Sequence, residues 1–439
     1  MSAQPHPEAF VRWFRQVAPY VHAFGGRTFV VGFGGEMIAD RGRFVGFLHD
    51  LNLLAALDIR LVLVHGARPQ IEAELRAKRL RSRYARGLRI TDAASLAAVK
   101  HAAGFLRVEI EALLSQGLPN SPMAGAQIRV ASGNFIAAKP IGVLEGVDFQ
   151  FTGTVRKVDG IAIARRLEAG EVVLVPHVGY SPTGEVFNLA WEDVAENVAR
   201  TLKADKLLLY VDQLPVGRRG QIISELTALE SEALLRKEGL TAPVKRAIEH
   251  ALRAVRAGVG RAHLISRRAE GATLLELFTH QGVGTMITAD PVERLRPAKI
   301  DDVGGILALI EPLEADGTLV KRNRERLEQE IANFEVIEHD GSILACAALY
   351  PYPDDKSAEL ACLAVSPEYR DAGYGERLLV ACEARAKVLK IRRVFALTTR
   401  AQHWFLAQGF KEAGVAVLPE KRQALYNWKR GSKIFLKRL

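Results

Sequence analysis

The chain contains 439 residues, of which 49% are hydrophobic and 25% are charged, and it carries a formal net charge of +10. One hydrophobic core rarely serves a chain of this length, so we expect two domains. No apolar run approaches the roughly 20 residues of a membrane-spanning helix, and the first residues lack the basic and apolar regions of a signal peptide. These features predict a soluble, cytoplasmic protein with no membrane partner.

The positive charge does not indicate a nucleic-acid partner, because Lys and Arg are spread along the chain and interleaved with Glu. A basic surface of this kind favours small anionic ligands instead. The three cysteines, Cys346, Cys362 and Cys382, include no Cys-x-x-Cys pair, and each lies in an apolar segment. We therefore expect reduced, packed thiols and neither a disulfide nor a metal site.

The first predicted element is an amphipathic helix over residues 7–24, which ends at Gly25 and Gly26. Its apolar residues recur at spacings of three and four: Phe10, Trp13, Phe14, Val17, Val21 and Phe24. Such a helix packs either on its own domain or on another subunit. The wide aromatic stripe gives the second interpretation at least equal weight, and residues 1–26 are interpreted as an oligomerisation arm.

From residue 27 onward, short strands alternate with helices. The expected strands are 29–33, 60–64, 171–176, 206–211 and 261–265, and the expected helices are 44–57, 70–79, 191–203 and 244–257. Strands rich in Val, Leu and Ile between helices predict an α/β fold, an open αβα sandwich with a mainly parallel sheet. In such a sheet ligands bind beyond the carboxyl ends of the strands, where the Gly-bearing loops 34–35 and 65–70 lie.

These loops resemble the amino-acid kinase family, in particular the N-acetylglutamate kinases. The matching segments are 30–35, 62–71, 89–92 and 210–212, together with Asn188 and Lys245. The resemblance implies a kinase-like domain over residues 27–289. Kinases of the family carry a lysine where this chain has Gly32 and an aspartate where it has Glu192. Since that lysine neutralises charge on the transferring phosphoryl group, the domain is expected to be regulatory and not to phosphorylate.

Residues 261–285 resemble the segment with which arginine-regulated members of the kinase family hold L-arginine, together with the N-terminal helix. The resemblance places His263, Glu276, Gly282 and Tyr20 on contact positions. A carboxylate at Glu276 suits a guanidinium or an α-ammonium group, and a glycine lets backbone carbonyls approach the ligand. Taken alone, Glu276 would instead be interpreted as a solvent-facing residue of an amphipathic helix.

Residues 290–297 are charged and bracketed by Pro291 and Pro297, which predicts a linker. The second domain is expected over residues 298–439. It begins with a helical pattern, and two apolar runs around Asp340 and Gly341 then predict a β-hairpin.

The run Arg370-Asp371-Ala372-Gly373-Tyr374-Gly375 separates an apolar strand, residues 359–365, from a helical pattern. Glycines at a helix start turn backbone N–H groups inward, and this nest and the helix dipole suit a pyrophosphate, although such glycines often serve only the turn. The run fits the Arg/Gln-x-x-Gly-x-Gly/Ala pattern and resembles the Gcn5-related N-acetyltransferases (GNAT), as do segments 393–397 and 404–410. The resemblance implies a smaller α/β domain with a mixed sheet, and it assigns Arg370, Gly373, Tyr374 and Gly375 to acetyl-CoA.

An acetyltransferase must position the thioester, remove a proton from an ammonium group and stabilise an oxyanion. We expect the strand edge at Leu363 and Val365 to pair with the pantetheine amides. Glu359 is the candidate base, because a glutamate in an apolar strand is either used or solvated at the strand end. Thr398 is a weaker candidate for donating a hydrogen bond or a proton to the leaving thiolate. Thr399 is an equal alternative, and either hydroxyl could serve only local hydrogen bonding.

Two basic stretches, 319–322 and 426–433, suggest an acidic amino acid as the acetyl acceptor. Nearly the whole chain resembles the bacterial N-acetylglutamate synthases, which join a kinase-like domain to a GNAT domain in this order. The resemblance implies direct acetyl transfer from acetyl-CoA to the α-amine of L-glutamate, the first step of arginine synthesis, with L-arginine as feedback inhibitor and a homo-hexamer as the assembly. It places Lys321 and Arg430 at the carboxylates of glutamate, where each could otherwise be a solvated surface cation. Two other classes stay open: a bifunctional synthase and kinase, and a non-catalytic sensor of arginine and coenzyme A.

Overall fold

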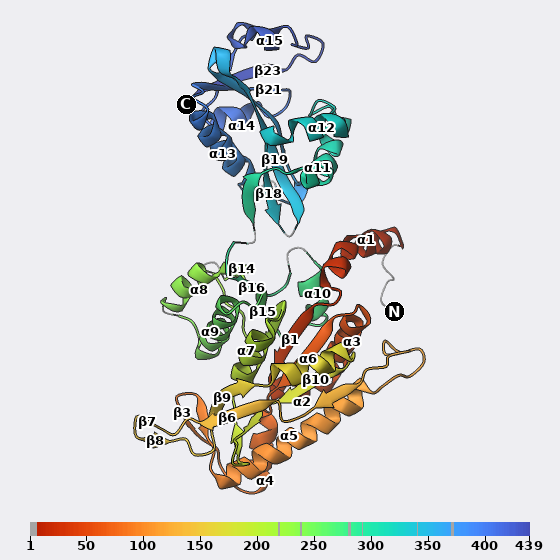
Figure 1. The fold of residues 1–439 in the computed structure, drawn as a ribbon, viewed down its shortest axis with the longest axis vertical. Helices are drawn as coiled ribbons and strands as arrows, with labels where there is room; N and C mark the ends of the chain where they lie inside the picture. The colour runs from red at the N-terminus through yellow and green to blue at the C-terminus, as the bar shows by residue number, and fades with distance from the viewer. Residues whose placement is uncertain are drawn as a thin grey trace. The chain divides into compact units, whose positions relative to one another are not determined.

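The computed structural model describes residues 7–217, 220–237, 239–279, 282–291, 293–339, 341–369 and 373–439. The chain divides into two compact units, of which unit 1 ends at Asp290 and unit 2 begins at Pro291 (Figure 1). None of the helices in these ranges is long and apolar enough to cross a membrane.

Unit 1 is built on a large, mostly parallel sheet. Its strand order is β14-β16-β15-β13-β1-β2-β10-β5, and the β15–β16 pair is antiparallel. The strands are β1 (Thr28–Phe33), β2 (Arg60–His65), β5 (Val130–Ser132), β10 (Val172–Pro176), β13 (Lys206–Val211), β14 (Glu225–Thr227), β15 (Arg261–Ser266) and β16 (Thr285–Thr288). The prediction of an open α/β fold with a mainly parallel sheet is thereby confirmed, because these apolar runs are buried on both faces.

Helices cover both faces of this sheet. The helices of unit 1 are α1 (Pro7–Phe24), α2 (Gly35–Ala39), α3 (Arg41–Ala56), α4 (Arg68–Ala77), α5 (Ala93–Leu114), α6 (Gly160–Glu168), α7 (Trp191–Leu202), α8 (Ala228–Leu235), α9 (Ala242–Arg256) and α10 (Ala272–Phe278). Alternate residues of β1 serve the two cores: Val30 packs in the core with α6, α7 and α9, whereas Val31 packs in the core with α3, α5 and α10. Each face of the sheet therefore has its own hydrophobic core.

Smaller strands complete unit 1. A second sheet has the order β12-β11-β6-β9, and two hairpins pair β3 with β4 and β7 with β8. The bounds are β3 (Arg83–Ala85), β4 (Leu88–Ile90), β6 (Ile136–Pro140), β7 (Val143–Leu144), β8 (Val147–Asp148), β9 (Gly153–Val158), β11 (Val178–Tyr180) and β12 (Val186–Asn188).

The two ends of helix α1 differ in their surroundings. Near its end, Phe24 packs against Phe29 of β1 and Phe278 of α10, with ring centroids 5.5 and 5.6 Å apart. Near its start, Phe10 and Phe14 are 52% and 62% exposed and stack on each other. The helix is therefore anchored on its own unit by one end and presents an uncovered aromatic surface at the other.

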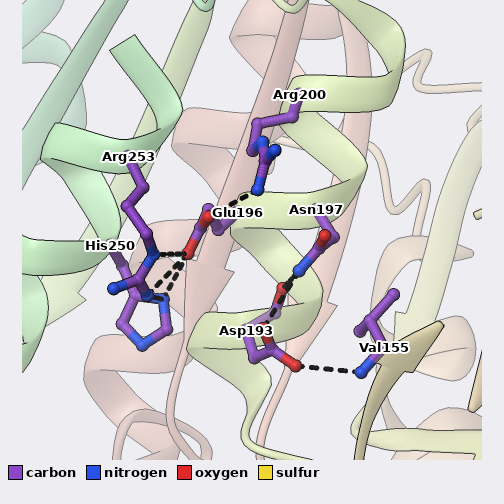
Figure 2. A network of polar contacts seen from close by, with 7 residues as sticks. All are labelled: Val155, Asp193, Glu196, Asn197, Arg200, His250 and Arg253. Carbon is purple, nitrogen blue, oxygen red and sulfur yellow. Dashed lines mark hydrogen bonds and ion pairs between the residues drawn. The ribbon is translucent and has the colours of Figure 1, made fainter. Parts of the chain in front are cut away.

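A buried carboxylate joins α7 to α9. Figure 2 shows Glu196 of α7 accepting hydrogen bonds from His250 (2.8 Å) and Arg253 (2.9 Å) of α9. Burial alone would raise the pKa of Glu196, but these hydrogen bonds lower it to about 2. The carboxylate therefore stays ionised at neutral pH and fixes the two helices side by side.

Replacing Asp50, a buried residue of α3, with asparagine is expected to stabilise unit 1 at high pH. Burial raises the pKa of Asp50 from 3.8 to about 6. The folded protein therefore favours the protonated carboxyl, whose contribution to the free energy of unfolding is fully present below pH 3.8 and is lost as pH rises through about 6. Above pH 7 the ionised carboxylate costs on the order of 3 kcal/mol, which asparagine avoids. Calorimetric unfolding should show Asp50→Asn more stable than the parent at pH 8, with the difference closing toward pH 4. A difference that does not change with pH would contradict this prediction.

Unit 2 is a mixed sheet with the order β17-β18-β19-β20-β21-β23-β22. Its strands are β17 (Arg294–Pro297), β18 (Phe334–His339), β19 (Ser342–Tyr352), β20 (Ser357–Val365), β21 (Arg393–Thr398), β22 (Lys411–Ala413) and β23 (Lys433–Arg438). Its helices are α11 (Val303–Ala315), α12 (Arg324–Glu330), α13 (Tyr374–Val388), α14 (Gln402–Ala407) and α15 (Glu420–Gln423). Helices α11 and α12 pack on one face and α13 on the other, and the predicted β18–β19 hairpin is confirmed.

Four residues inside the predicted linker form strand β17. It pairs antiparallel with β18, and Leu295 lies opposite Ile337. Arg296 forms ion pairs with Asp302 (2.7 Å) and Glu338 (3.0 Å). Sequence reasoning missed this strand, because charged residues between prolines are typical of a linker and Glu338, one of the two acids that pair with Arg296, lies far along the chain.

Candidate functional site

The sheet of unit 2 opens between β20 and β21. Strand β20 pairs with β19 over its whole length, from Ser357 to Val365. It pairs with β21 only from Ser357 to Leu360, so residues 361–365 form no ladder on that side within the described chain. An irregularity in the β19–β20 pairing accompanies a left-handed backbone at Cys362, whose φ is +53°. The strand edge predicted to bind pantetheine, at Leu363 and Val365, therefore has backbone groups available for another partner.

The predicted pyrophosphate loop ends where α13 begins, on one face of this opening. Gly373 is the N-cap residue of α13 with φ +74°, and the described structure shows no side-chain hydrogen bond capping this helix. The dipole of α13 thus favours an anion at this helix start. A Cβ at Gly375 would lie 3.2 Å from Trp404, so this position is also closely packed. The predicted contact Arg370 lies outside the described residues.

The Tyr374 side chain is engaged within the protein. Its ring is buried and stacks on Tyr369 with centroids 5.6 Å apart, and its hydroxyl donates a hydrogen bond to Glu293. The part of Tyr374 that faces the predicted anion site is therefore its backbone at the helix start.

Glu359, the candidate base, is buried and held by an arginine. It is only 8% exposed, and both its oxygens accept hydrogen bonds from Arg422, at 2.6 and 3.0 Å. The Glu359 carboxylate raises the pKa of Arg422. The solvated interpretation of Glu359 is therefore wrong, and a bidentate pair of this kind fixes the position of the carboxylate. Sequence reasoning missed Arg422, because nothing local marks a partner 63 residues away.

Thr398 ends β21 on the other side of the opening. Its Oγ1 accepts hydrogen bonds from the backbone N–H of Arg400 (3.2 Å) and of Ala401 (2.9 Å), so its own hydroxyl proton is left to donate elsewhere. Glu359 lies beside Phe395 in the β20–β21 register. Side chains alternate along β21, so Thr398 points to the sheet face opposite that of Phe395 and Glu359. A substrate bound in the opening would therefore have Glu359 on one face of the sheet and Thr398 on the other.

The two predicted glutamate-binding cations differ in their surroundings. Lys321 is exposed, whereas the Arg430 guanidinium donates hydrogen bonds to the carbonyls of Gly317 (3.2 Å) and Thr318 (2.7 Å). Arg430 thus secures the turn that leads to Lys321.

Arg322, beside Lys321, is a further candidate that was not singled out from the sequence. Its Nε is buried without a hydrogen-bond partner in the described structure. Burial would lower the pKa of its guanidinium, but neighbouring Cys362 and Tyr350 raise it. Tyr350 lies directly opposite Glu359 in the β19–β20 register. A cation therefore lies beside Tyr350, the residue paired with the candidate base Glu359, and its buried nitrogen, unpartnered in the described structure, is what identifies it.

In unit 1 the predicted arginine-binding residues converge. His263 of β15 lies 2.7 Å from Oε1 of Glu276 on α10, and Oε2 of Glu276 accepts from the N–H groups of Val283 (2.8 Å) and Gly284 (2.7 Å). Gly282 has φ +60°, and a Cβ there would lie 2.5 Å from Glu276. Glu276 is 8% exposed, which excludes the solvent-facing interpretation. The fourth predicted residue, Tyr20 of α1, contacts Phe278 of the same helix as Glu276, with ring centroids 6.4 Å apart.

Lys206 of β13 joins this cluster and was missed by sequence reasoning. Its Nζ lies 3.3 Å from Nε2 of His263 and 5.0 Å from the Phe24 ring centroid. Burial and the charge of Arg261 lower the pKa of Lys206 to about 7. Burial and the charge of Lys206 lower the pKa of His263 to about 4. A strand lysine beside an apolar run gives no local signal of this role.

Neighbouring side chains fill the space at Gly32, the position where the kinases carry a lysine. A Cβ at Gly32 would lie 2.8 Å from the Trp191 indole and 3.2 Å from Leu209. A lysine side chain therefore has no room there. Glu192, the second departure from the kinase pattern, has its pKa raised by burial.

Comparison with known proteins covers both units. Residues 27–266 match the amino acid kinase family, and residues 330–412 match the acetyltransferase (GNAT) domain. The amino-acid acetyltransferase of Ralstonia nicotianae is 51% identical over 437 residues, which are 99% of this chain and 96% of that protein. The amino-acid acetyltransferase of Azotobacter vinelandii is 49% identical over 431 residues, 98% of this chain and 99% of that protein.

A solved structure of N-acetylglutamate synthase from Neisseria gonorrhoeae, complexed with coenzyme A and L-arginine, matches with a TM-score of 0.89 and 38% identity. The match covers 98% of this chain and 99% of that one. A second structure of that synthase, complexed with coenzyme A and N-acetylglutamate, matches over the same shares with a TM-score of 0.62.

The fold and the opened sheet define a two-part acyltransferase, in which an amino-acid-kinase fold precedes a GNAT fold. Because these relatives are similar over nearly the whole chain, the chain belongs to the amino-acid acetyltransferase family.

Proposed function

We propose that the chain transfers the acetyl group of acetyl-CoA to the α-amine of L-glutamate, as the first step of arginine biosynthesis, and that L-arginine inhibits it. The observation that carries this proposal is the opening of β20 from β21, flanked by the start of α13 at Gly373 and by Glu359. The similarity to a synthase complexed with coenzyme A and L-arginine supports the choice of ligands.

Unit 2 would hold the donor along the opening. The N–H groups at Gly373 and Gly375 and the dipole of α13 bind the pyrophosphate. The pantetheine amides pair with the free backbone of residues 361–365, and an N–H group there faces the thioester oxygen. These contacts fix the thioester carbon next to the acceptor amine, which lowers the entropic cost of the reaction.

Transfer then follows by direct attack without an acyl-enzyme. Glu359, positioned by Arg422, takes a proton from the ammonium group, and the free amine attacks the thioester carbon. The tetrahedral oxyanion accepts a hydrogen bond from the β20 backbone. The intermediate collapses by breaking the C–S bond while its nitrogen releases its second proton to solvent. The Thr398 hydroxyl donates to the departing thiolate a hydrogen bond, or a proton that solvent then restores.

Glutamate would be held through its carboxylates by Lys321, Arg322 and Arg430. We expect Arg322→Met to raise the KM for glutamate by about 10- to 100-fold, because a charge-assisted hydrogen bond is lost from a buried position. The KM for acetyl-CoA should change little. Arg324→Met removes an exposed arginine of the neighbouring helix, paired with Glu328, and serves as the matched control. Equal effects of the two variants would exclude a specific role of Arg322.

Arginine would bind in unit 1 between α1 and α10, at Tyr20, His263, Glu276 and Gly282. Three of the about four acceptor positions of the Glu276 carboxylate are used within the protein, and the remaining one is suited to a guanidinium or an ammonium group. Because α1 packs on α10 through aromatic contacts, a ligand bound here would contact α1, the proposed oligomerisation arm.

We further propose that the exposed aromatic surface of α1 joins subunits, and that the assembly is a hexamer. Replacing Phe10 and Phe14 with serine is expected to reduce the molar mass measured by analytical ultracentrifugation, since both rings are exposed in the single chain. Val11→Ser on the same helix is the control for lost helix stability. A double variant with the parent molar mass would contradict the proposal.

The cytoplasm is the proposed site of action. The three cysteines are free thiols, which suits a reducing compartment.

Two other functions are less well supported. A bifunctional synthase and kinase needs a positive charge beside the transferring phosphoryl group. The kinase lysine that supplies this charge is replaced here by Gly32, and Trp191 fills the space beside it. ATP-dependent phosphorylation of N-acetylglutamate by the purified protein would support the bifunctional function. A sensor without catalysis would bind coenzyme A and arginine and form no product.

The deciding experiment incubates the full chain with acetyl-CoA and L-glutamate, with and without L-arginine, and measures N-acetylglutamate and free thiol. We expect both products in equal amounts and less of each with arginine. Absence of an acetylated amino acid would overturn the proposed function.

A further inference from the structure

A carboxylate of the predicted linker reaches the start of α13. Glu293 lies directly before β17, in the segment that leads from unit 1 into unit 2. Its Oε1 accepts a hydrogen bond from the Tyr374 hydroxyl, and its Oε2 lies 2.6 Å from a guanidinium nitrogen of Arg377. Both partners belong to the first turn of α13, which follows Gly373 and carries the proposed pyrophosphate site. The linker therefore holds the turn on which the donor is expected to bind.

These contacts are made by buried and charged groups. Tyr374 is 3% exposed, its ring stacks on Tyr369, and the Arg377 guanidinium lies 5.5 Å from its ring centroid. Burial alone would raise the pKa of Glu293, but the hydrogen bonds from Tyr374 and Arg377 lower it. The carboxylate is therefore ionised at neutral pH, and hydrogen bonds to an ionised acceptor are about twice as strong as those between neutral groups.

The surroundings of Glu293 connect it to the rest of the donor site. Leu295, two residues further along the chain, packs against the same hydrophobic core as Leu363 of the opened strand edge. The Trp404 indole of α14 donates a hydrogen bond to Glu376, in the same first turn of α13, at 3.0 Å. The turn is thus held by α14 as well as by the linker, and the linker contact involves two of its side chains.

We infer that Glu293 is a positioning residue for the acetyl donor, because its contacts with Tyr374 and Arg377 fix the first turn of α13 in the orientation that binds the pyrophosphate. The inference rests on the proposed function of unit 2. Glu293 does not bind the donor itself, since a carboxylate and a diphosphate repel each other. It acts through the backbone N–H groups of the turn, so its removal should weaken binding of the donor and leave the acid–base chemistry at Glu359 unchanged.

The test compares Glu293→Gln with the parent chain in two measurements: the KM for acetyl-CoA, and the Kd of coenzyme A from calorimetric titration. Glutamine keeps the length of the side chain but loses the charge that the two donors face. We expect both constants to rise about tenfold, because charge-assisted hydrogen bonds become neutral ones. The kcat and the KM for glutamate should change little. Glu293→Asp keeps the charge on a shorter side chain and should restore part of the affinity.

Glu335→Gln is the matched control. Glu335 of β18 is a second carboxylate that pairs with α13, but it contacts Arg385 in the last turn of the helix, at 3.3 Å. This variant loses an ion pair of the same helix and should keep the parent affinity for coenzyme A. Tyr374→Phe removes the hydroxyl alone. Combined with Glu293→Gln, it should raise the Kd by less than the product of the two single effects, because both variants remove the same hydrogen bond.

Unchanged constants in Glu293→Gln would overturn the inference. An equal rise in Glu293→Gln and Glu335→Gln would overturn it as well, since it would indicate a general loss of helix stability. Thermal unfolding shows whether each variant is folded, and Glu293→Asp and Tyr374→Phe carry the test if Glu293→Gln is not. A chain that binds coenzyme A through Glu293 but forms no N-acetylglutamate contradicts the proposed function alone. Product formation with the parent KM for acetyl-CoA in Glu293→Gln contradicts the role of Glu293 alone.

Discussion

Glu359→Gln is expected to lower kcat for acetyl transfer by about 10²- to 10⁴-fold, the contribution typical of a positioned general base. Glutamine keeps the shape of the side chain and can still accept a hydrogen bond from Arg422, but it cannot take a proton from the ammonium group. Binding of acetyl-CoA should be retained, because its predicted contacts lie on β20 and at the start of α13. Stopped-assay kinetics and calorimetric titration of coenzyme A would measure the two quantities.

Raising the pH provides a second readout for Glu359. If its only catalytic task is to deprotonate the amine, activity of Glu359→Gln should recover as the pH approaches the pKa of the glutamate α-amine. Glu412→Gln, which removes an exposed carboxylate paired with Lys433 on an edge strand of the same sheet, is the matched control. Normal turnover by Glu359→Gln would remove this residue from the mechanism. A protein inert in its natural form but able to bind coenzyme A would favour the sensor.

Glu276→Gln is expected to raise the arginine concentration for half-inhibition by about 10²-fold. Glu276 is the buried carboxylate at the centre of the predicted arginine site, and loss of one partner from a buried, hydrogen-bonded charge pair costs about 2 to 5 kcal/mol. Uninhibited turnover should change little, because the proposed catalytic residues belong to unit 2. The thermal stabilisation that arginine gives to the parent protein should be reduced in parallel.

The control for Glu276→Gln is Glu270→Gln, which changes an exposed carboxylate shortly before α10. It should keep the parent response to arginine. Because Glu276 also accepts hydrogen bonds from Val283 and Gly284, an unfolding scan without arginine must show that the variant is folded. Unchanged inhibition in a folded Glu276→Gln would place the arginine site elsewhere.

The sequence was sufficient for features that depend on neighbouring residues. The alternation of apolar strands and helices predicted the parallel sheet of unit 1, and the glycines at 373 and 375 marked the start of α13. The loss of the kinase lysine was visible as Gly32. Each of these depends on local backbone preference or on periodicity, which a single sequence displays directly.

Only the tertiary structure decided which side chains meet across long separations. It paired Glu359 with Arg422, joined Lys206 to His263, placed Trp191 against Gly32 and turned four linker residues into β17. It also left the start of α1 exposed while packing Phe24, at its end, against Phe29 of the sheet. Burial and pairing of charges depend on which elements pack together, and that choice is made by the whole hydrophobic core rather than by any one segment.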